Sequence, residues 1–113
     1  GLIKERVTST TTPNANPTFA RGNITSTSNT STGSIAYEAT SGRHVYFYKD
    51  TGNSGYNTVV AGVWSSGAMT WGTPTVVASA GAGSGNNATI CAGNGAIYVQ
   101  YIQGSYTGME VKS

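Results

Sequence analysis

Apolar and polar residues alternate along most of this chain in short runs, and turns rich in Gly, Ser and Asn separate the runs. A period of two predicts β-strands, because successive side chains of a strand point to opposite faces of its sheet. No stretch shows a helical period. The runs that we expect to be strands are 35–38, 44–49, 58–64, 68–71, 75–78, 89–91, 96–103 and 109–111. The pattern therefore predicts an all-β fold, an antiparallel meander of strands joined by tight turns.

The run 44–49 (HVYFYK) gives the strongest strand signal in the chain. Val45 and Phe47 are expected on one face of this strand, and its His and two Tyr residues on the other. Both faces are large and partly apolar, so we predict that this strand is central in its sheet.

The first 33 residues differ from the rest and are expected to form an extended N-terminal arm before a β domain at 34–113. Between Thr8 and Ser34, 14 of 27 residues are Ser or Thr, and Pro13 and Pro17 exclude a helix there. Such a segment buries little apolar surface by itself. It is either a flexible tail or an arm that becomes ordered by adding a strand to a neighbouring subunit. The apolar residues that would anchor the arm in a subunit interface are Leu2, Ile3, Val7, Phe19 and Ile24.

The β domain contains a weak internal repeat. Residues 97–99 (IYV) can be placed over 45–47 (VYF), and Gly104 then falls on Gly52. Each copy begins with a short strand and a Gly-containing turn, but only the first copy continues through a fourth strand. A repeated four-stranded meander is the unit of a β-propeller, and two incomplete blades would need other chains to close a ring. A small β-sandwich built from the same hairpins is the alternative, and the sequence leaves both open.

Composition narrows the classes of partner. Of the 113 residues only 9% are charged, and the net charge is +2 from scattered basic residues. Nucleic-acid binding usually needs a clustered basic face, so no nucleic-acid partner is expected. No apolar run approaches the length of a membrane helix and the charged start GLIKERV lacks the apolar core of a signal peptide, so no membrane partner is expected.

The chain has few side chains that could act as acid, base or nucleophile: one His, one Cys, one Asp and three Glu. His44 and Cys91 could in principle form a base and a nucleophile, but a lone His and a lone Cys on strands are more often surface and small apolar residues. Ligand sets for a zinc or calcium site are missing. We therefore expect no enzyme, no cofactor and no metal site.

Aromatic residues are the most distinctive functional candidates. Aromatic side chains stack on sugar rings and also anchor protein interfaces, although cross-strand packing inside a sheet explains many of them. The candidates for ligand or interface contacts are Tyr46, Tyr48, Tyr56, Trp64, Trp71, Tyr98 and Tyr106.

Part of the chain resembles a known module. The matching residues are 48–50 (YKD), 52–54 (GNS), 56–58 (YNT), 59–62 (VVAG) and 72–74 (GTP). They are similar to a β-rich tandem-repeat module, with the pattern YRD-GNS-YGT-VVGTVSG, of phage and marine bacterial fibre-like virion proteins. Members of that family carry several copies, whereas this chain has one copy and a fragment. The resemblance covers about a third of the chain and implies a place in a larger particle.

Together these features predict a bacteriophage virion structural protein, either a capsid decoration (cement) protein or a tail or fibre subunit. It would be located in the virion and contact other virion proteins and copies of itself, with a trimer as the expected homo-oligomer. The alternative is an oligomeric carbohydrate-binding lectin, in which the aromatic residues bind a glycan between partial propeller blades.

Overall fold

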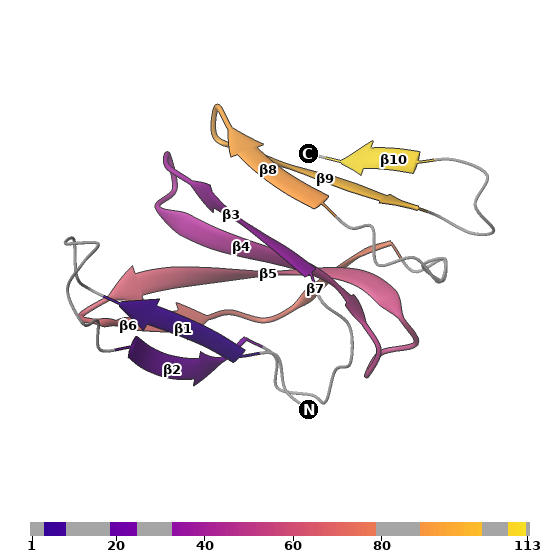
Figure 1. The fold of residues 1–113 in the computed structure, drawn as a ribbon. Helices are drawn as coiled ribbons and strands as arrows, with labels where there is room; N and C mark the ends of the chain where they lie inside the picture. Colours follow the sequence, from indigo (N-terminus) through magenta and orange to yellow (C-terminus); the bar gives the residue numbers. More distant parts are fainter. Residues whose placement is uncertain (1–3, 9–18, 25–32, 79–88, 103–108, 113) are drawn as a thin grey trace.

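The computed structural model describes residues 4–8, 19–24, 33–78, 89–102 and 109–112. Within these residues the chain is all-β, with antiparallel strands and no helix. The predicted fold class is confirmed, and the elements divide into sheets of five, three and two strands (Figure 1).

The five-stranded sheet corresponds to the first copy of the repeat. Its strands are β3 (Gly33–Glu38), β4 (Arg43–Asp50), β5 (Tyr56–Ser65), β6 (Ala68–Trp71) and β7 (Thr75–Ala78). β4 lies between β3 and β5, as predicted for a strand with two apolar faces. β6 pairs with the second half of β5, and β7 pairs with the first half. β6 and β7 thus act as one strand that is interrupted at 72–74. At the break the Gly72 N–H still donates to the Ala61 carbonyl oxygen, at 2.8 Å.

The three-stranded sheet corresponds to the second copy. It contains β8 (Thr89–Gly93), β9 (Ala96–Ile102) and β10 (Met109–Lys112), with β9 in the middle. β8 pairs along β9 as far as the turn, whereas β10 pairs only with Val99 to Ile102. The first half of β9 therefore has no strand partner on its β10 side among the described residues.

Two tight turns close the hairpins of these sheets. Ser66 and Gly67 have φ of 51° and 84°, and Asn94 and Gly95 have φ of 52° and 78°. Positive φ at both central residues defines a type I′ turn, whose twist matches that of the strands it joins. The Asn-Gly and Ser-Gly pairs of the sequence thus set the register of both hairpins.

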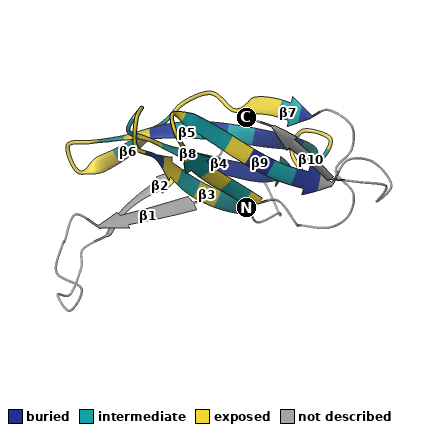
Figure 2. Cartoon of the chain, turned by 90° about the horizontal axis from the view of Figure 1, so that it is seen from above, coloured by how far each residue is buried: buried dark blue, intermediate teal, exposed yellow. Residues whose placement is uncertain are grey.

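The five-stranded and three-stranded sheets face each other across a shared apolar core. Phe47 is fully buried there among Ala78, Val99 and Tyr101, and its ring lies 6.0 Å from that of Tyr101. Figure 1 shows β8–β10 above the five-stranded sheet and β1–β2 below it, and Figure 2 shows buried positions along β4 and β9.

The way in which the copies face each other decides between the two predicted architectures. Propeller blades stack front to back, so equivalent residues of neighbouring blades would point in the same rotational sense. Here Phe47 and its equivalent Val99 point into the same core, so the copies meet front to front. That is the arrangement of a small sandwich.

The N-terminal segment supplies the third, two-stranded sheet. β1 (Lys4–Thr8) pairs with β2 (Phe19–Asn23) in an antiparallel ladder, so this part of the predicted extended arm is folded back on itself. Ile24 is buried against the chain's own Tyr46, Tyr48 and Val60. The side chains of the other anchors, Leu2, Ile3, Val7 and Phe19, lie outside the described side chains, and their contact with a neighbouring subunit stays a prediction.

Candidate functional site

The register of the five-stranded sheet gathers most of the predicted aromatic residues on its outer face, away from the three-stranded sheet. Tyr46 lies opposite Val60, and Trp71 lies opposite Gly62. Directly paired residues share a face, so the same side holds one aromatic cluster. The predicted residues on this aromatic face are Tyr46, Tyr48, Tyr56, Trp64 and Trp71.

The middle of the aromatic face is an apolar core rather than an open surface. Tyr46 and Tyr48 are buried beneath Ile24, with ring centroids 5.4 Å apart. Burial raises the pKa of Tyr46, and burial together with the charge of Asp50 raises the pKa of Tyr48 to about 12. Both phenols are therefore neutral across the physiological range and act as packing residues.

A row of ring-bearing residues crosses the other end of this face. Tyr37, His44, Gly62 and Trp71 are consecutive partners across β3, β4, β5 and β6. Tyr37 is half exposed, with its ring 4.8 Å from that of His44. The His44 Nδ1 and Trp71 Nε1 atoms are buried, and no described residue forms a hydrogen bond with either of them. The ring of Tyr37 is therefore the part of the row that a ligand can reach.

Gly62 is the residue that lets the indole of Trp71 lie flat in this row. A Cβ atom at Gly62 would lie 2.7 Å from Cε3 of Trp71 and 2.8 Å from Cε of Met69, closer than van der Waals contact allows. Gly62 is therefore needed for packing, because only a residue without a side chain leaves room for the ring of Trp71. In the sequence, the sign of this role is a glycine inside the strand run VVAGVW.

Two of the predicted aromatic residues do not join this face. Tyr98 lies on the outer face of the three-stranded sheet and is partly exposed. Tyr106 lies outside the described residues. Sequence reasoning did not include Ile35 and Tyr37, which are both 54% exposed at the free edge of the sheet. Their alternation in the run IAYE was the signal that could have identified them.

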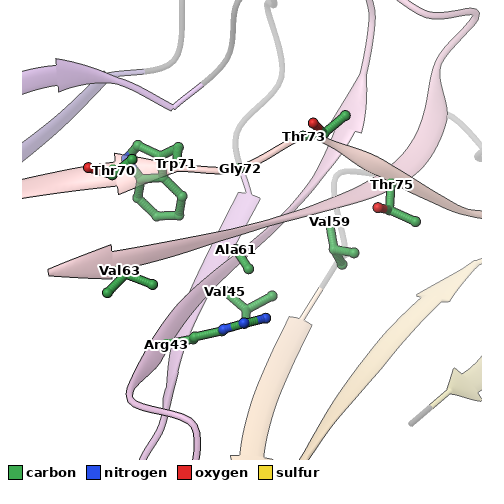
Figure 3. A pocket seen from close by; sticks show the side chains of 10 residues that line it. All are labelled: Arg43, Val45, Val59, Ala61, Val63, Thr70, Trp71, Gly72, Thr73 and Thr75. Carbon is green, nitrogen blue, oxygen red and sulfur yellow. The ribbon is translucent and has the colours of Figure 1, made fainter.

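A second site lies on the inner face of β4 and β5, where the three-stranded sheet leaves part of the five-stranded sheet uncovered. It consists of two adjoining hollows of about 460 and 400 Å³ that share Val45, Val59, Ala61 and Thr75. One hollow ends at Arg43 and Val63, and the other continues to β9 at Ile97 and Val99. We call these two hollows together the inner groove, and Figure 3 shows the side chains that line the hollow with Arg43.

Among the described residues that line the inner groove, Arg43 is the only one with a charged side chain. Its cross-strand partner is Glu38, but both Glu38 carboxylate oxygens accept hydrogen bonds from the adjoining loop. The Thr40 N–H donates at 2.9 Å and the Ser41 N–H at 2.6 Å, and these two bonds lower the pKa of Glu38 to about 2. No other carboxylate among the described residues contacts Arg43. Its guanidinium lies beside Val45 in the groove, where its N–H donors can meet a ligand or a partner (Figure 3).

The structure separates the two residues considered as a catalytic pair. His44 lies on the outer face of the five-stranded sheet, opposite Gly62, and Cys91 lies on the outer face of the three-stranded sheet, opposite Tyr98. The two residues thus face away from each other across the sandwich. In the described part of the chain no three His, Cys, Asp or Glu residues gather as a metal site would require. No helix among the described residues is long and apolar enough to span a membrane.

Comparison of the chain with protein-family models, with curated proteins and with solved structures found no match in any of the three. The functional argument therefore depends on the surfaces of this chain and on the resemblance seen in its sequence.

Proposed function

We propose that this protein is a structural subunit of a bacteriophage-like virion, a capsid decoration protein or a tail or fibre component, that acts through contacts with other subunits. The observation that carries the proposal is the inner groove, because it is apolar surface between the sheets that no described strand covers. Aliphatic side chains from β4, β5, β7 and β9 line it. Apolar surface of this kind is typical of interfaces that another chain completes.

Exposed apolar residues elsewhere support the same proposal. Among the residues whose burial the structure describes, five large apolar side chains are substantially exposed, and they lie on both sheets: Ile35, Tyr37, Val63, Val76 and Tyr98. With only 9% charged residues, the chain has few groups to keep such surfaces in water. Burial between copies, for which we propose a trimer, would remove this apolar area from solvent at each interface.

The location of the chain in purified particles tests this function. Particles from a host that carries the gene would be banded on a density gradient and analysed by quantitative mass spectrometry. We expect the chain in the particle band, in a fixed ratio to the major capsid protein. Recovery of the chain only from the particle-free fraction would overturn the virion assignment.

A lectin is the second candidate function, and the row from Tyr37 to Trp71 favours it. Tyr37 offers a half-exposed ring beside the ring of His44, and the row contains no Lys, Arg, Asp or Glu. Uncharged sugars present both an apolar ring face and hydroxyl groups. Screening the full chain on a glycan array would test this candidate. Binding that Tyr37→Ala removes would support it, and an empty array would argue against it.

A further inference from the structure

The free edge of β9 borders the inner groove. In the hairpin of β8 and β9, Gly93 pairs with Ala96 across a two-residue turn, so these residues exchange backbone hydrogen bonds with each other. Ile97 is the next residue and directs its N–H and C=O away from β8. β10 pairs only from Val99 onwards, so no described strand meets Ile97 on that side. An added strand could pair there.

A strand in that position would lie over the inner groove. Ile97 and Val99 line one hollow of the groove, and Val45 and Ala61 of the facing sheet line both. Alternate side chains of the added strand would therefore enter an aliphatic hollow. One of them would meet the guanidinium of Arg43, with which no described carboxylate pairs. The groove thus calls for an extended segment with apolar residues at alternate positions and a carboxylate between them.

The chain itself contains such a segment at β1. In the sequence, Ile3, Glu5 and Val7 stand at alternate positions, and β1 contains Glu5 and Val7. In an extended strand alternate residues share a face, so the sequence has the apolar, acidic, apolar pattern that the inner groove calls for.

The pairing of β1 with β2 is poorly stabilised. Its register places Arg6 directly opposite Arg21, and like charges in directly opposite positions destabilise an antiparallel pair. β1 and β2 also form a sheet of only two strands, separate from the other two sheets. An isolated two-stranded sheet is marginally stable in water, so β1 can leave β2 at little cost in free energy.

We propose that β1 of one copy docks in the inner groove of a second copy, pairs with β9 at Ile97 and places Glu5 on Arg43. This inference rests on the proposed function, because it names the contact through which the subunits assemble. Exchange of one strand between identical chains is a common route to oligomers and can close a trimer as well as a dimer.

Charge reversal tests the contact in the full-length chain. Arg43→Glu and Glu5→Arg each create a like-charge pair in the groove, and we expect each to weaken self-association roughly tenfold or more. Arg43→Glu combined with Glu5→Arg restores an opposite-charge pair and should return the association constant to within about threefold of the wild type. Lys4→Glu changes the net charge as much as Arg43→Glu does, on the opposite face of β1, and serves as the matched control.

Association would be measured by sedimentation velocity over a range of protein concentrations, with circular dichroism as a check that each variant is folded. Arg43→Gln and Glu5→Gln provide milder variants if a reversal unfolds the chain. In the wild type we also expect hydrogen exchange at the Ile97 amide to slow as the protein associates. Association that is insensitive to both reversals, failure of the double reversal to rescue, or unchanged exchange at Ile97 would overturn this contact while leaving the proposed function standing. A wild-type chain that stays monomeric at all concentrations would overturn the docking of β1 between copies and would also remove the basis of the proposed assembly into a trimer.

Discussion

At the residue scale, the carboxylate of Glu38 forms its hydrogen bonds with the loop that follows it. The side chain closes the turn between β3 and β4 by accepting from the N–H groups of Thr40 and Ser41. Asp50 does the same in the next loop, where its Oδ1 accepts from the Gly52 N–H at 3.1 Å. Two of the chain's four acids are thus used to order turns, and among the described residues Arg43 is left without a carboxylate partner.

The lowered pKa of Glu38 predicts a specific dependence of stability on pH. The folded pKa is about 2, against an ordinary value of 4.5, so the folded state binds this proton less readily than the unfolded state does. The contribution of Glu38 to the free energy of unfolding is therefore complete above pH 4.5 and is lost as the pH falls towards 2. We expect Glu38→Gln to be less stable than the wild type in urea at pH 7, and the difference to shrink between pH 4.5 and 2. A difference that is constant over this range would contradict the assignment.

At the element scale, the type I′ turns determine which strands pair. Asn-Gly at 94–95 is a favoured pair for this turn, whereas Ser-Gly at 66–67 places an ordinary L-residue at positive φ. Ser66 therefore carries a conformational cost that Asn would reduce, because Asn tolerates the left-handed region better than most residues.

Ser66→Asn is accordingly expected to stabilise the protein by roughly 0.5 kcal/mol, and Ser66→Val to destabilise it by about 1 kcal/mol or more. Ser66 is exposed, so neither change disturbs the core. Urea unfolding of the two variants beside the wild type measures both shifts. An equal effect of Asn and Val would show that the turn conformation does not determine stability here.

At the scale of the whole molecule, the front-to-front packing of the two copies creates one core between the sheets. Phe47 has no exposed surface, and it packs with Ala78 of β7 in its own sheet and with Val99 and Tyr101 of β9 in the facing sheet. The equivalent alternation in the second copy places Val99 inward and Tyr98 outward. The core therefore depends on the same set of positions in both copies.

Phe47→Ala should cost about 3–5 kcal/mol of unfolding free energy, because it leaves a cavity between the sheets. Tyr98→Ala, at the outward position of the second copy, should cost less than about 1 kcal/mol. Thermal or urea unfolding compares the two, and Phe47→Leu provides a graded loss if the alanine variant does not fold. Similar costs at both positions would contradict the shared core.

The sequence by itself determined the strands and the faces of the sheets. The alternation of residues 44–49 predicted which side chains of β4 share a face, and the Gly-rich pairs predicted the turns, because strand period and turn geometry are local properties of the backbone. Five of the seven aromatic candidates then fell on one face by register alone. The choice between a flexible N-terminal tail and an arm that adds a strand to a neighbouring subunit depends on partners, and local pattern carries no information about them.

Only the tertiary structure decided how the copies meet. A repeat in the sequence is compatible with front-to-back and front-to-front packing, since both bury the same apolar positions, and the shared core of Phe47 and Val99 distinguishes them. The inner groove was likewise invisible, because its walls come from residues as distant in the chain as Val45 and Ile97. The sequence also did not show that the Glu38 carboxylate accepts from Thr40 and Ser41 instead of pairing with Arg43, because this depends on the geometry of a loop rather than on the residue types.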